Sequence, residues 1–430
     1  MTLTEAAYWT KKLIWFVVAG FILFIVLVIV IVNKSKPQQL PQYIFPDFAC
    51  TQTKEEFLRH KLNLDSIEYT LESSENAFVF DTPSGKIDQL PEVINVYRYD
   101  NPGQYLTVQD DAKRLAEALG FEGEMQRIGT TVYRWADSNH RTLTVQARNF
   151  TFDLKIDLAE SSALPKEALP TEDNAKKTAR DVLTNLDLLY RDYADQEPET
   201  LDITIEKDGS FREGKYKDET DLIRVDFVRK ASMITIPSNV TGADEMRNMW
   251  ERKGYRSTEE EVQTPEGKLT LYKFNTLMAS IDPFKSNISV YVGGANPDLK
   301  GRGVNRIYGI EYKNWIVEPE YCGTYKLLTP GEVLTNVQNE KASLVYLYEK
   351  DSDFILKDGS KNVRNFHIKD INIFYYDAPH EQEFLQPIYV ITGEATFTTG
   401  RAGEFMFYHP AIDYDFIQDR ETPGEEEELL

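Results

Sequence analysis

One uninterrupted apolar segment constrains this chain more than any other feature. Residues Leu13–Val32 read LIWFVVAGFILFIVLVIVIV, twenty residues with no charged, amide or proline side chain. At about 1.5 Å of rise per helical residue, the segment is about 30 Å long, which matches the hydrocarbon core of a bilayer. It is too long for a cleavable signal peptide, and no small-x-small cleavage site ends it. The sequence therefore predicts a single-pass membrane protein with an uncleaved signal-anchor.

The orientation of this predicted helix depends on the residues beside it. Two lysines precede it and two follow it closely, so the positive charges on its two sides are tied. A short N-terminal stub, residues 1–12, is easily left in the cytosol while a large domain is translocated. We therefore expect a cell-membrane protein with a cytoplasmic N terminus and an extracytoplasmic C-terminal domain. Residues 33–52 follow the predicted helix of residues 13–32, and their proline- and glutamine-rich composition predicts an extended spacer.

Two similar helices predict an internal duplication. Thr107–Phe121 begins with threonine, has two acidic residues in its first turn, and ends with glycine before an aromatic residue. Thr241–Tyr255 repeats this pattern, and the tetrapeptide Val-Leu-Thr-Asn occurs in a second predicted helix of each half, at 182–185 and 333–336. The sequence therefore predicts two α+β repeat pairs and an acidic tail. Their boundaries are 53–236, 237–415 and 416–430.

Alternating apolar and polar residues after these helices predict β-strands. Each predicted helix has one apolar stripe, which requires a covering sheet. The predicted fold class is therefore α+β: a single N-terminal transmembrane helix followed by tandem helix-on-antiparallel-sheet modules. The first stripe consists of Val108, Ala112, Leu115, Ala116 and Leu119. The predicted strands are Thr142–Arg148, Phe150–Ile156, Leu222–Arg229, Ile288–Val292, Arg306–Tyr312, Ile371–Tyr376, Ile388–Thr392 and Glu404–Tyr408.

The C-terminal region resembles a known family. Its motifs are Thr-Tyr-Lys-Leu-Leu-Thr-Pro-Gly-Glu-Val-Leu from Thr324, Ile-Asn-Ile-Phe-Tyr-Tyr up to Tyr376, and Leu-Gln-Pro-Ile-Tyr-Val up to Val390. They resemble the C-terminal half of YycH/YycI-type membrane-anchored envelope regulatory proteins and, more loosely, PepSY-like modules. This resemblance implies extracytoplasmic helix-on-sheet modules that modulate a cell-envelope sensor kinase. It implies no catalytic residue.

Residues able to carry acid–base, nucleophilic or metal chemistry are scattered along the chain. The histidines show no spacing typical of a pair of metal ligands. The nearest approach to a metal motif is His380-Glu381-Gln382-Glu383, which we interpret as an exposed loop between two strands. We therefore predict no catalytic, cofactor-binding or metal-binding residue. The histidines are His60, His140, His367, His380 and His409.

Acidic residues dominate the charge of the chain. Its 70 acidic and 48 basic side chains give a net charge of −22, which argues against nucleic acid as a partner. The carboxylates of Asp110–Asp111 and Glu259–Glu261 could in principle do acid–base work. Asp110 and Asp111 suit the first turn of a helix, so we interpret that pair as structural rather than catalytic. Tyrosines in the predicted strands are interpreted as packing residues rather than sugar-stacking platforms. These are Tyr375, Tyr376, Tyr389 and Tyr408.

The chain has two cysteines, Cys50 and Cys322. They permit one disulfide in an oxidising compartment, but the sequence does not decide whether they pair. The features together predict a non-enzymatic, membrane-anchored extracytoplasmic protein that binds or regulates an envelope protein partner, with a sensor kinase as one candidate. The alternative is a cell-envelope hydrolase or glycan-binding protein whose site is assembled from loops.

Overall fold

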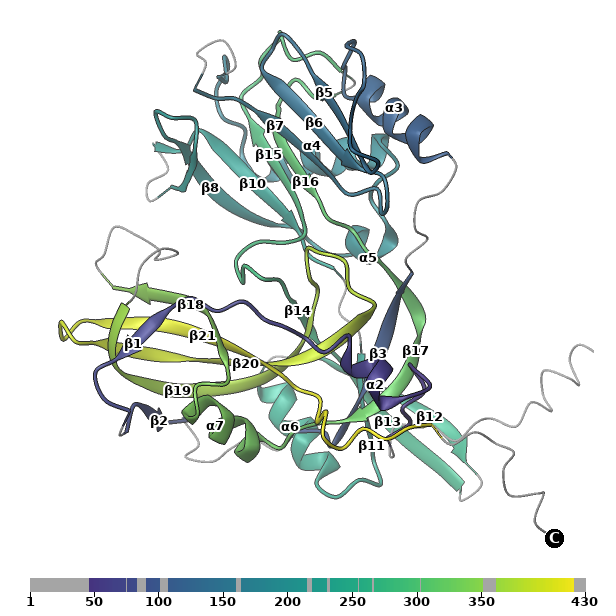
Figure 1. The fold of residues 1–430 in the computed structure, drawn as a ribbon, viewed down its shortest axis with the longest axis vertical. Helices are drawn as coiled ribbons and strands as arrows, with labels where there is room; N and C mark the ends of the chain where they lie inside the picture. Colours follow the sequence, from purple (N-terminus) through teal and green to yellow (C-terminus); the bar gives the residue numbers. More distant parts are fainter. Residues whose placement is uncertain are drawn as a thin grey trace, which may run out of the picture.

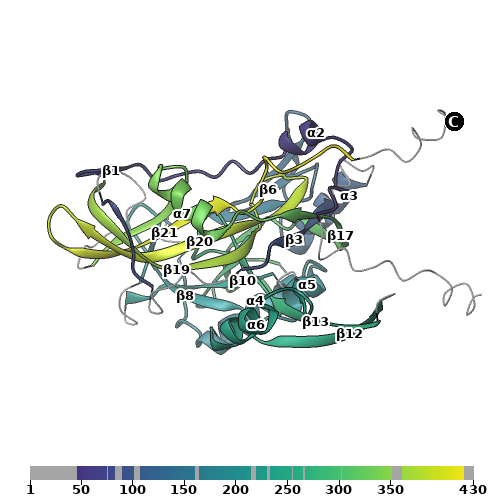
Figure 2. The same cartoon turned by 90° about the horizontal axis from the view of Figure 1, so that it is seen from below.

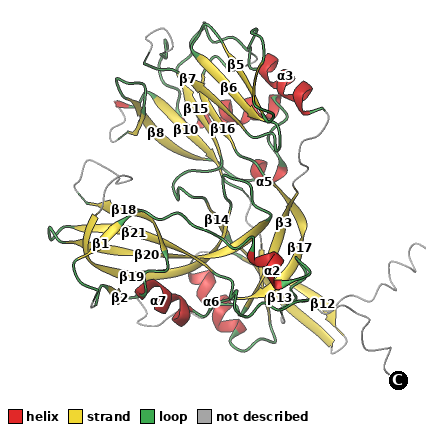
Figure 3. Ribbon diagram, viewed as in Figure 1, coloured by secondary structure: helices red, strands yellow, loops and turns green. Residues whose placement is uncertain are grey.

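The computed structural model describes residues 46–74, 76–82, 90–100, 107–159, 164–214, 219–229, 233–253, 255–264, 267–301, 303–350 and 361–420. Figure 1 shows them as two β-sheet units, one above the other. We call them the upper unit and the lower unit, as they are drawn in that view. Strands make up most of the secondary structure of both units (Figure 3).

The upper unit contains one nine-stranded sheet. Its strands are β4 (Gln126–Ile128), β5 (Val132–Ala136), β6 (Arg141–Gln146), β7 (Phe152–Ile156), β8 (Glu199–Ile205), β9 (Phe211–Glu213), β10 (Leu222–Phe227), β15 (Ile288–Gly293) and β16 (Ile307–Tyr312). Their order in the sheet is β4-β5-β6-β7-β16-β15-β10-β8-β9. All neighbouring pairs are antiparallel. Five of the eight neighbouring pairs in this order join strands that follow one another directly in the sequence.

Helices cover one face of the upper sheet. They are α3 (Val108–Ala118), α4 (Glu172–Asn185) and α5 (Arg191–Ala194). The predicted stripe of the first helix is confirmed, since all five of its residues are buried and belong to the core of this unit. Thr171 caps α4, because its side chain accepts a hydrogen bond from the backbone N–H of Asn174. In α3 and α4 the spacing of the apolar residues thus determines which side of the helix faces the sheet.

The lower unit is built on a second nine-stranded sheet. Its strands are β1 (Tyr69–Leu71), β2 (Phe78–Phe80), β3 (Val93–Asp100), β14 (Leu277–Ala279), β17 (Ile316–Lys326), β18 (Ser343–Glu349), β19 (Lys361–Tyr376), β20 (Phe384–Phe397) and β21 (Ala402–Pro410). The main path is β1-β19-β20-β21-β18, and β3 links β20 to β17. Three short strands, β1, β2 and β14, pair in parallel with the long β19. Apart from the consecutive pairs β19-β20 and β20-β21, this sheet therefore brings together strands that are distant in the sequence.

A small sheet and three helices complete the lower unit. The additional elements are β11 (Met233–Pro237), β12 (Ser257–Thr264), β13 (Gly267–Asn275), α2 (Lys54–Leu58), α6 (Ala243–Arg252) and α7 (Pro330–Gln338). The three strands pair in the order β11-β13-β12. Figure 2, the view from below, shows α6 beside this small sheet. Helices α6 and α7 bury Met246, Trp250 and Val333 in one core with the large sheet.

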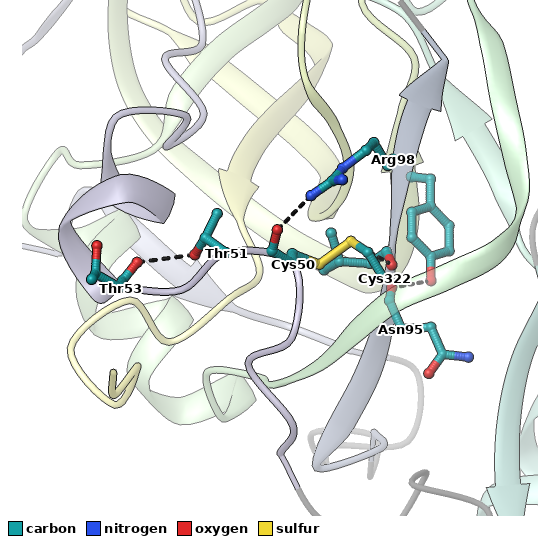
Figure 4. Close-up of a disulfide and its surroundings, with 8 residues drawn as sticks. Cys50, Thr51, Thr53, Asn95, Arg98 and Cys322 are labelled. Carbon is teal, nitrogen blue, oxygen red and sulfur yellow. Dashed lines mark hydrogen bonds between the residues drawn. A yellow bond between two sulfur atoms is a disulfide. The ribbon is translucent and has the colours of Figure 1, made fainter. Parts of the chain in front are cut away.

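A disulfide fastens the start of the described chain to the lower sheet. Cys50 is bonded to Cys322 of β17, with their Cα atoms 4.6 Å apart (Figure 4). Arg98 of β3 donates a 2.6 Å hydrogen bond to the carbonyl oxygen of Cys50. The question that the sequence left open is thereby answered, because the two cysteines pair across 272 positions of sequence.

The predicted α+β fold of separate helix-on-sheet modules is wrong. All eight predicted strands are confirmed, but they merge with strands from elsewhere into two nine-stranded sheets, and the six described helices are short. The physical reason is that a small isolated sheet leaves rows of unpaired backbone groups at its edges. Pairing of β7 with β16, and of β3 with β17, satisfies those edges with distant strands. The molecule is therefore mainly β-sheet.

The predicted boundary between residues 53–236 and 237–415 does not separate the two units. β15 and β16 come from the second predicted half but lie in the upper sheet, whereas β1, β2 and β3 come from the first half and lie in the lower sheet. The supposed equivalence of Thr107 and Thr241 also fails at the helix caps. Thr107 is the N-cap of α3, but Gly242, with φ of 80°, occupies that position in α6. Each unit is therefore discontinuous in the sequence.

The single-pass membrane architecture requires a correction as well. No helix in the described part of the chain is long and apolar enough to cross a membrane. The segment on which the prediction depended, Leu13–Val32, lies outside the described residues, as do the stub at 1–12, most of the spacer and residues 421–430 of the acidic tail.

Candidate functional site

A small cavity lies where the upper and lower units meet. Its volume is about 220 Å³, and we call it the junction cavity. The upper unit contributes the start of β8, the end of β10 and the residues before β15, and the lower unit contributes β14 and the end of β19. The lining residues are Glu199, Asp226, Val228, Arg229, Leu277, Met278, Ala279, Ser280, Pro283, Phe284, Lys285, Ser286, Asn287, Phe374 and Asp377.

The strongest polar contact of the junction joins Arg229 to Asp377. The Nε atom of Arg229, just after β10, donates to a carboxylate oxygen of Asp377, just after β19, over 3.0 Å. The same guanidinium donates to the carbonyl oxygen of Trp315 over 2.6 Å. Both charged side chains are buried, with 3% and 7% of their surface exposed. Burial alone would lower the pKa of Arg229, but the charge of Asp377 raises it, so the guanidinium stays charged.

Two tyrosines surround this ion pair. The hydroxyl group of Tyr99 donates to the second carboxylate oxygen of Asp377 over 3.0 Å. The guanidinium carbon of Arg229 lies 4.9 Å from the centre of the Tyr193 ring, within the range of a cation–π contact. Burial raises the pKa of both tyrosines well above 10, so neither is a source of phenolate at physiological pH. The cluster fixes β3, β10 and β19 to one another.

A second buried ion pair lies on β10 itself. The Nε atom of Arg224 donates to Asp226 over 2.8 Å, and the Ser289 hydroxyl donates to the other oxygen of Asp226 over 2.5 Å. Burial raises the pKa of Asp226, while Arg224 and Ser289 act in the opposite direction. The serine donates its proton to a carboxylate that already has a cationic partner. This arrangement orients Ser289 as a structural donor rather than as a nucleophile.

The remaining cation of the junction cavity is also engaged. Lys285 forms a 2.7 Å ion pair with Glu311 of β16, and Tyr291 donates to the same carboxylate over 3.1 Å. Burial alone would raise the pKa of Glu311, but Lys285 lowers it. Three ion pairs, Arg229–Asp377, Arg224–Asp226 and Lys285–Glu311, therefore occupy the cations in and beside the junction.

A larger hollow lies on the upper unit, beside the C-terminal end of α3. Its volume is about 750 Å³. Two ion pairs lie on its rim, where Lys113 approaches Glu117 and Lys300 approaches Glu122. The aromatic residues of its wall, Phe121 and Trp135, are only 4% and 2% exposed, so they offer no open ring face to a ligand.

The structure disperses the residues of the predicted metal-like sequence. Glu381 forms a 2.7 Å ion pair with Arg148, and Glu383 lies 2.9 Å from a ring nitrogen of His60. The interpretation of residues 380–383 as a loop between strands is confirmed, because they join β19 to β20. Within the described ranges, no group of three or more histidine, cysteine, aspartate or glutamate side chains is arranged to hold a metal ion.

The other residues considered from the sequence occupy structural positions. Asp111 accepts hydrogen bonds from Thr107 and Arg114 in the first turn of α3. The glutamates of β12 pair with cations of β13 and α6, and one example is Glu261 with Lys268 at 2.9 Å. The interpretation of the strand tyrosines as packing residues is confirmed, since each is at most 1% exposed: Tyr375, Tyr376, Tyr389 and Tyr408.

Sequence analysis missed the charged residues of the junction. A signal for two of them exists, because Arg224 and Asp226 are two positions apart in an otherwise apolar run, and this spacing places both on one face of a strand. A buried strand with opposite charges on one face predicts an internal ion pair. No comparable signal connects Arg229 with Asp377, which are 148 positions apart.

Comparisons with known proteins give little guidance. No family model matches the chain, and no curated protein matches it. A solved structure titled as an uncharacterized protein from Eubacterium rectale ATCC 33656 is similar over 81% of this chain and 92% of its own, with 10% identity and a TM-score of 0.33. So low a score carries no argument about fold or function. The resemblance to YycH/YycI-type proteins stays a prediction.

Proposed function

We propose that this chain is a non-enzymatic extracytoplasmic protein that binds or regulates a protein partner of the cell envelope. A sensor kinase is one candidate partner, in line with the resemblance of residues 324–390 to YycH/YycI-type proteins. The observation that carries the proposal is that the cations of the junction cavity are already paired with carboxylates of the chain itself. The pair Arg229–Asp377 joins the two units, and the other two pairs lie within the upper unit. Groups held in this way stabilise the structure, whereas a catalytic site needs an acid, base or nucleophile free to react.

The disulfide supports the extracytoplasmic location. Disulfides persist in oxidising compartments and are rare in the cytosol, where thiol reductants keep cysteines reduced. Cys50 is 2% exposed, and its bond to Cys322 joins two distant parts of the lower unit. A bond that is buried and joins distant strands fits a structural role better than a catalytic one.

The alternative function, a hydrolase or glycan-binding protein, has weaker support. The hollow beside α3 has the volume of a ligand site, since such sites measure about 300–1,000 Å³. Its tryptophan and phenylalanine are covered, however, and sugar binding by stacking requires an exposed ring face. We therefore keep this function as an outcome of the test and not as a second proposal.

Site-specific photocrosslinking in producing cells tests the proposal. A benzoylphenylalanine placed at Leu277, which is 50% exposed on the rim of the junction cavity, should form one discrete adduct with an envelope protein. The matched control is Ile128, 46% exposed on the distant edge strand β4, which should not form that adduct. Turnover of an envelope glycan, peptide or ester that is lost in Asp226→Asn would refute the proposal.

A further inference from the structure

Two apolar side chains stand open on the rim of the junction cavity. Leu277 and Phe284 are 50% and 49% exposed, the two highest values among the large apolar residues in the described part of the chain. Both line the junction cavity. Exposed apolar residues that gather at one place mark an interaction site more often than single ones do.

The apolar rim continues onto the lower sheet. The ring of Phe284 lies edge-on to Tyr346 of β18, with the ring centres 4.7 Å apart. Tyr346 is opposite Met406 in the sheet, and Tyr348 is opposite Glu404, which in turn is opposite Glu394. We call these five residues, Tyr346, Tyr348, Glu394, Glu404 and Met406, the acidic sheet face.

None of the five side chains of the acidic sheet face is fully buried. The intervening positions Leu347, Ala395 and Phe405 are buried in the core on the other side of the sheet. At Tyr346 the acidic sheet face contacts Phe284 of the upper unit. Burial raises the pKa of Tyr346 to about 12, and the charges of Glu404 and of Glu213 from β9 add to this rise. Glu213 belongs to the upper sheet, so the two units approach one another here as well as at the junction cavity.

The volume of the junction cavity limits which kind of ligand fits into it. At about 220 Å³ it is smaller than the 300–1,000 Å³ typical of sites for small organic ligands. It has room for a single long side chain, whose neighbours along the polypeptide would then lie over Phe284 and the acidic sheet face. The geometry suits an extended segment of a protein more than a compact metabolite.

The net charge around the junction cavity and the acidic sheet face indicates the charge of the partner that would bind there. Each of the three internal ion pairs has no net charge. Glu199, Glu213 and Glu404 make no ion pair within the described ranges. Glu394 is 4.0 Å from Lys369, which lies closer to Asp81. The surplus charge is negative, which favours a cationic partner.

We propose that the junction cavity and the acidic sheet face together bind an extended basic segment of the partner protein, an inference that depends on the proposed binding function. One lysine or arginine of the segment enters the junction cavity. Its aliphatic stem lies against Leu277 and Phe284, and its charged end reaches Glu199. The next cationic side chain pairs with Glu404, and the tyrosines pack against the segment.

Fluorescence anisotropy with purified full-length protein tests this proposal. The probe is a fluorescein-labelled nine-residue peptide of alternating lysine and leucine, and a peptide with glutamate in place of lysine is its control. The lysine peptide should bind, and its affinity should fall as salt rises. The double variant Glu199→Lys/Glu404→Lys should weaken binding at least tenfold, and the milder Glu199→Gln/Glu404→Gln should weaken it in the same direction.

The matched control is Glu318→Lys/Glu320→Lys. Both of these glutamates are exposed on β17, away from the junction cavity, and the change in net charge is the same. This variant should keep affinity within twofold. Equal loss of binding in both lysine variants would show that the effect depends only on the net charge of the protein, and it would overturn the proposal. Binding of the glutamate peptide with the same affinity as the lysine peptide would also overturn it. Binding of an N-acetylglucosamine tetrasaccharide that Glu199→Lys/Glu404→Lys abolishes would assign the surface to a glycan.

The crosslinking and peptide-binding results together distinguish failure of the basic-segment proposal from failure of the proposed binding function. A crosslinked partner at Leu277 together with no affinity for the lysine peptide would leave the binding function standing and remove only the basic segment. An enzymatic activity lost in Asp226→Asn would remove the binding function, whatever the peptide result.

Discussion

The upper and lower units are built from sheets of equal strand number, but consecutive strands form five of the eight neighbouring pairs in the upper sheet and two of the eight in the lower. In the upper sheet β4, β5, β6 and β7 follow one another as hairpins. In the lower sheet Tyr69 is opposite Lys361 and Ile94 is opposite Tyr325. The comparison teaches that one unit depends mainly on local pairing, and the other on closure of long loops, which costs entropy before any contact forms.

The largest effect should come from a charge placed in either core. Leu115→Asp in the upper unit and Met249→Asp in the lower unit should each lower the free energy of unfolding by more than about 4 kcal/mol, because a carboxylate would be buried without a partner. Urea denaturation measures the change. Lys113→Asp on the exposed side of α3 should change it by less than about 1 kcal/mol.

If the two units are independent, each core variant should shift only its own transition. A single shared transition that both variants shift equally would show that the contrast in connectivity has no counterpart in stability.

Loss of one partner of the junction ion pair should come next. Arg229→Met leaves Asp377 buried without its cation and should cost about 3–5 kcal/mol, since it also separates the units at their strongest polar contact. The control is Arg59→Ala, whose ion pair with Glu55 is exposed and should be worth less than about 1 kcal/mol. Calorimetry should show a larger difference between the melting temperatures of the two units in Arg229→Met than in the wild type. Unchanged melting would mean that this ion pair does not hold the units together.

Removal of the disulfide should affect one unit only. Cys50→Ala/Cys322→Ala should lower the stability of the lower unit by about 2–5 kcal/mol, because the unfolded chain is no longer closed into a loop. The upper unit should be unaffected. Reducing agent should have the same effect on the wild type and none on the double variant. Free thiols found by alkylation of the native protein would contradict both this prediction and the proposed location.

The smallest effect should distinguish two helix caps. Thr329 forms a capping box with Glu332 at the start of α7, so Thr329→Ala should cost about 1 kcal/mol. Thr107 makes no capping hydrogen bond to the backbone of α3, so Thr107→Ala should cost only a few tenths of that. Chemical denaturation of both variants measures the difference. Equal costs would show that the hydroxyl of Thr107 caps in solution.

The local elements were predictable because their signals are local. Alternation identified the cores of β6, β7, β10, β15 and β16. The capping box of Thr329 and Glu332 is local as well, since it depends on two residues three positions apart. What failed was assembly. The strands β1, β2 and β14 have three residues each, too few for a periodic pattern, and they exist because the distant strand β19 offers backbone partners.

The candidate site was predictable to a smaller degree than the fold. Arg224 and Asp226 could have been recognised by their spacing on β10, but Arg229, Asp377 and Tyr99 meet only after the two sheets have formed. The spacing of residues can therefore indicate charges paired along one strand, but it gives no sign of those paired between strands from distant parts of the chain.

The disulfide also decides which parts of the molecule can carry mechanical tension. The upper unit lies wholly between Cys50 and Cys322 in the sequence, inside the covalent ring that they close. The far end of the described chain lies beside the near end, where Arg420 donates to the carbonyl oxygen of Gln52. A pull on residues 46 and 420 passes from Cys50 through sulfur to β17 and on through the lower sheet. The upper unit lies off this force path and stays folded while the lower unit is strained.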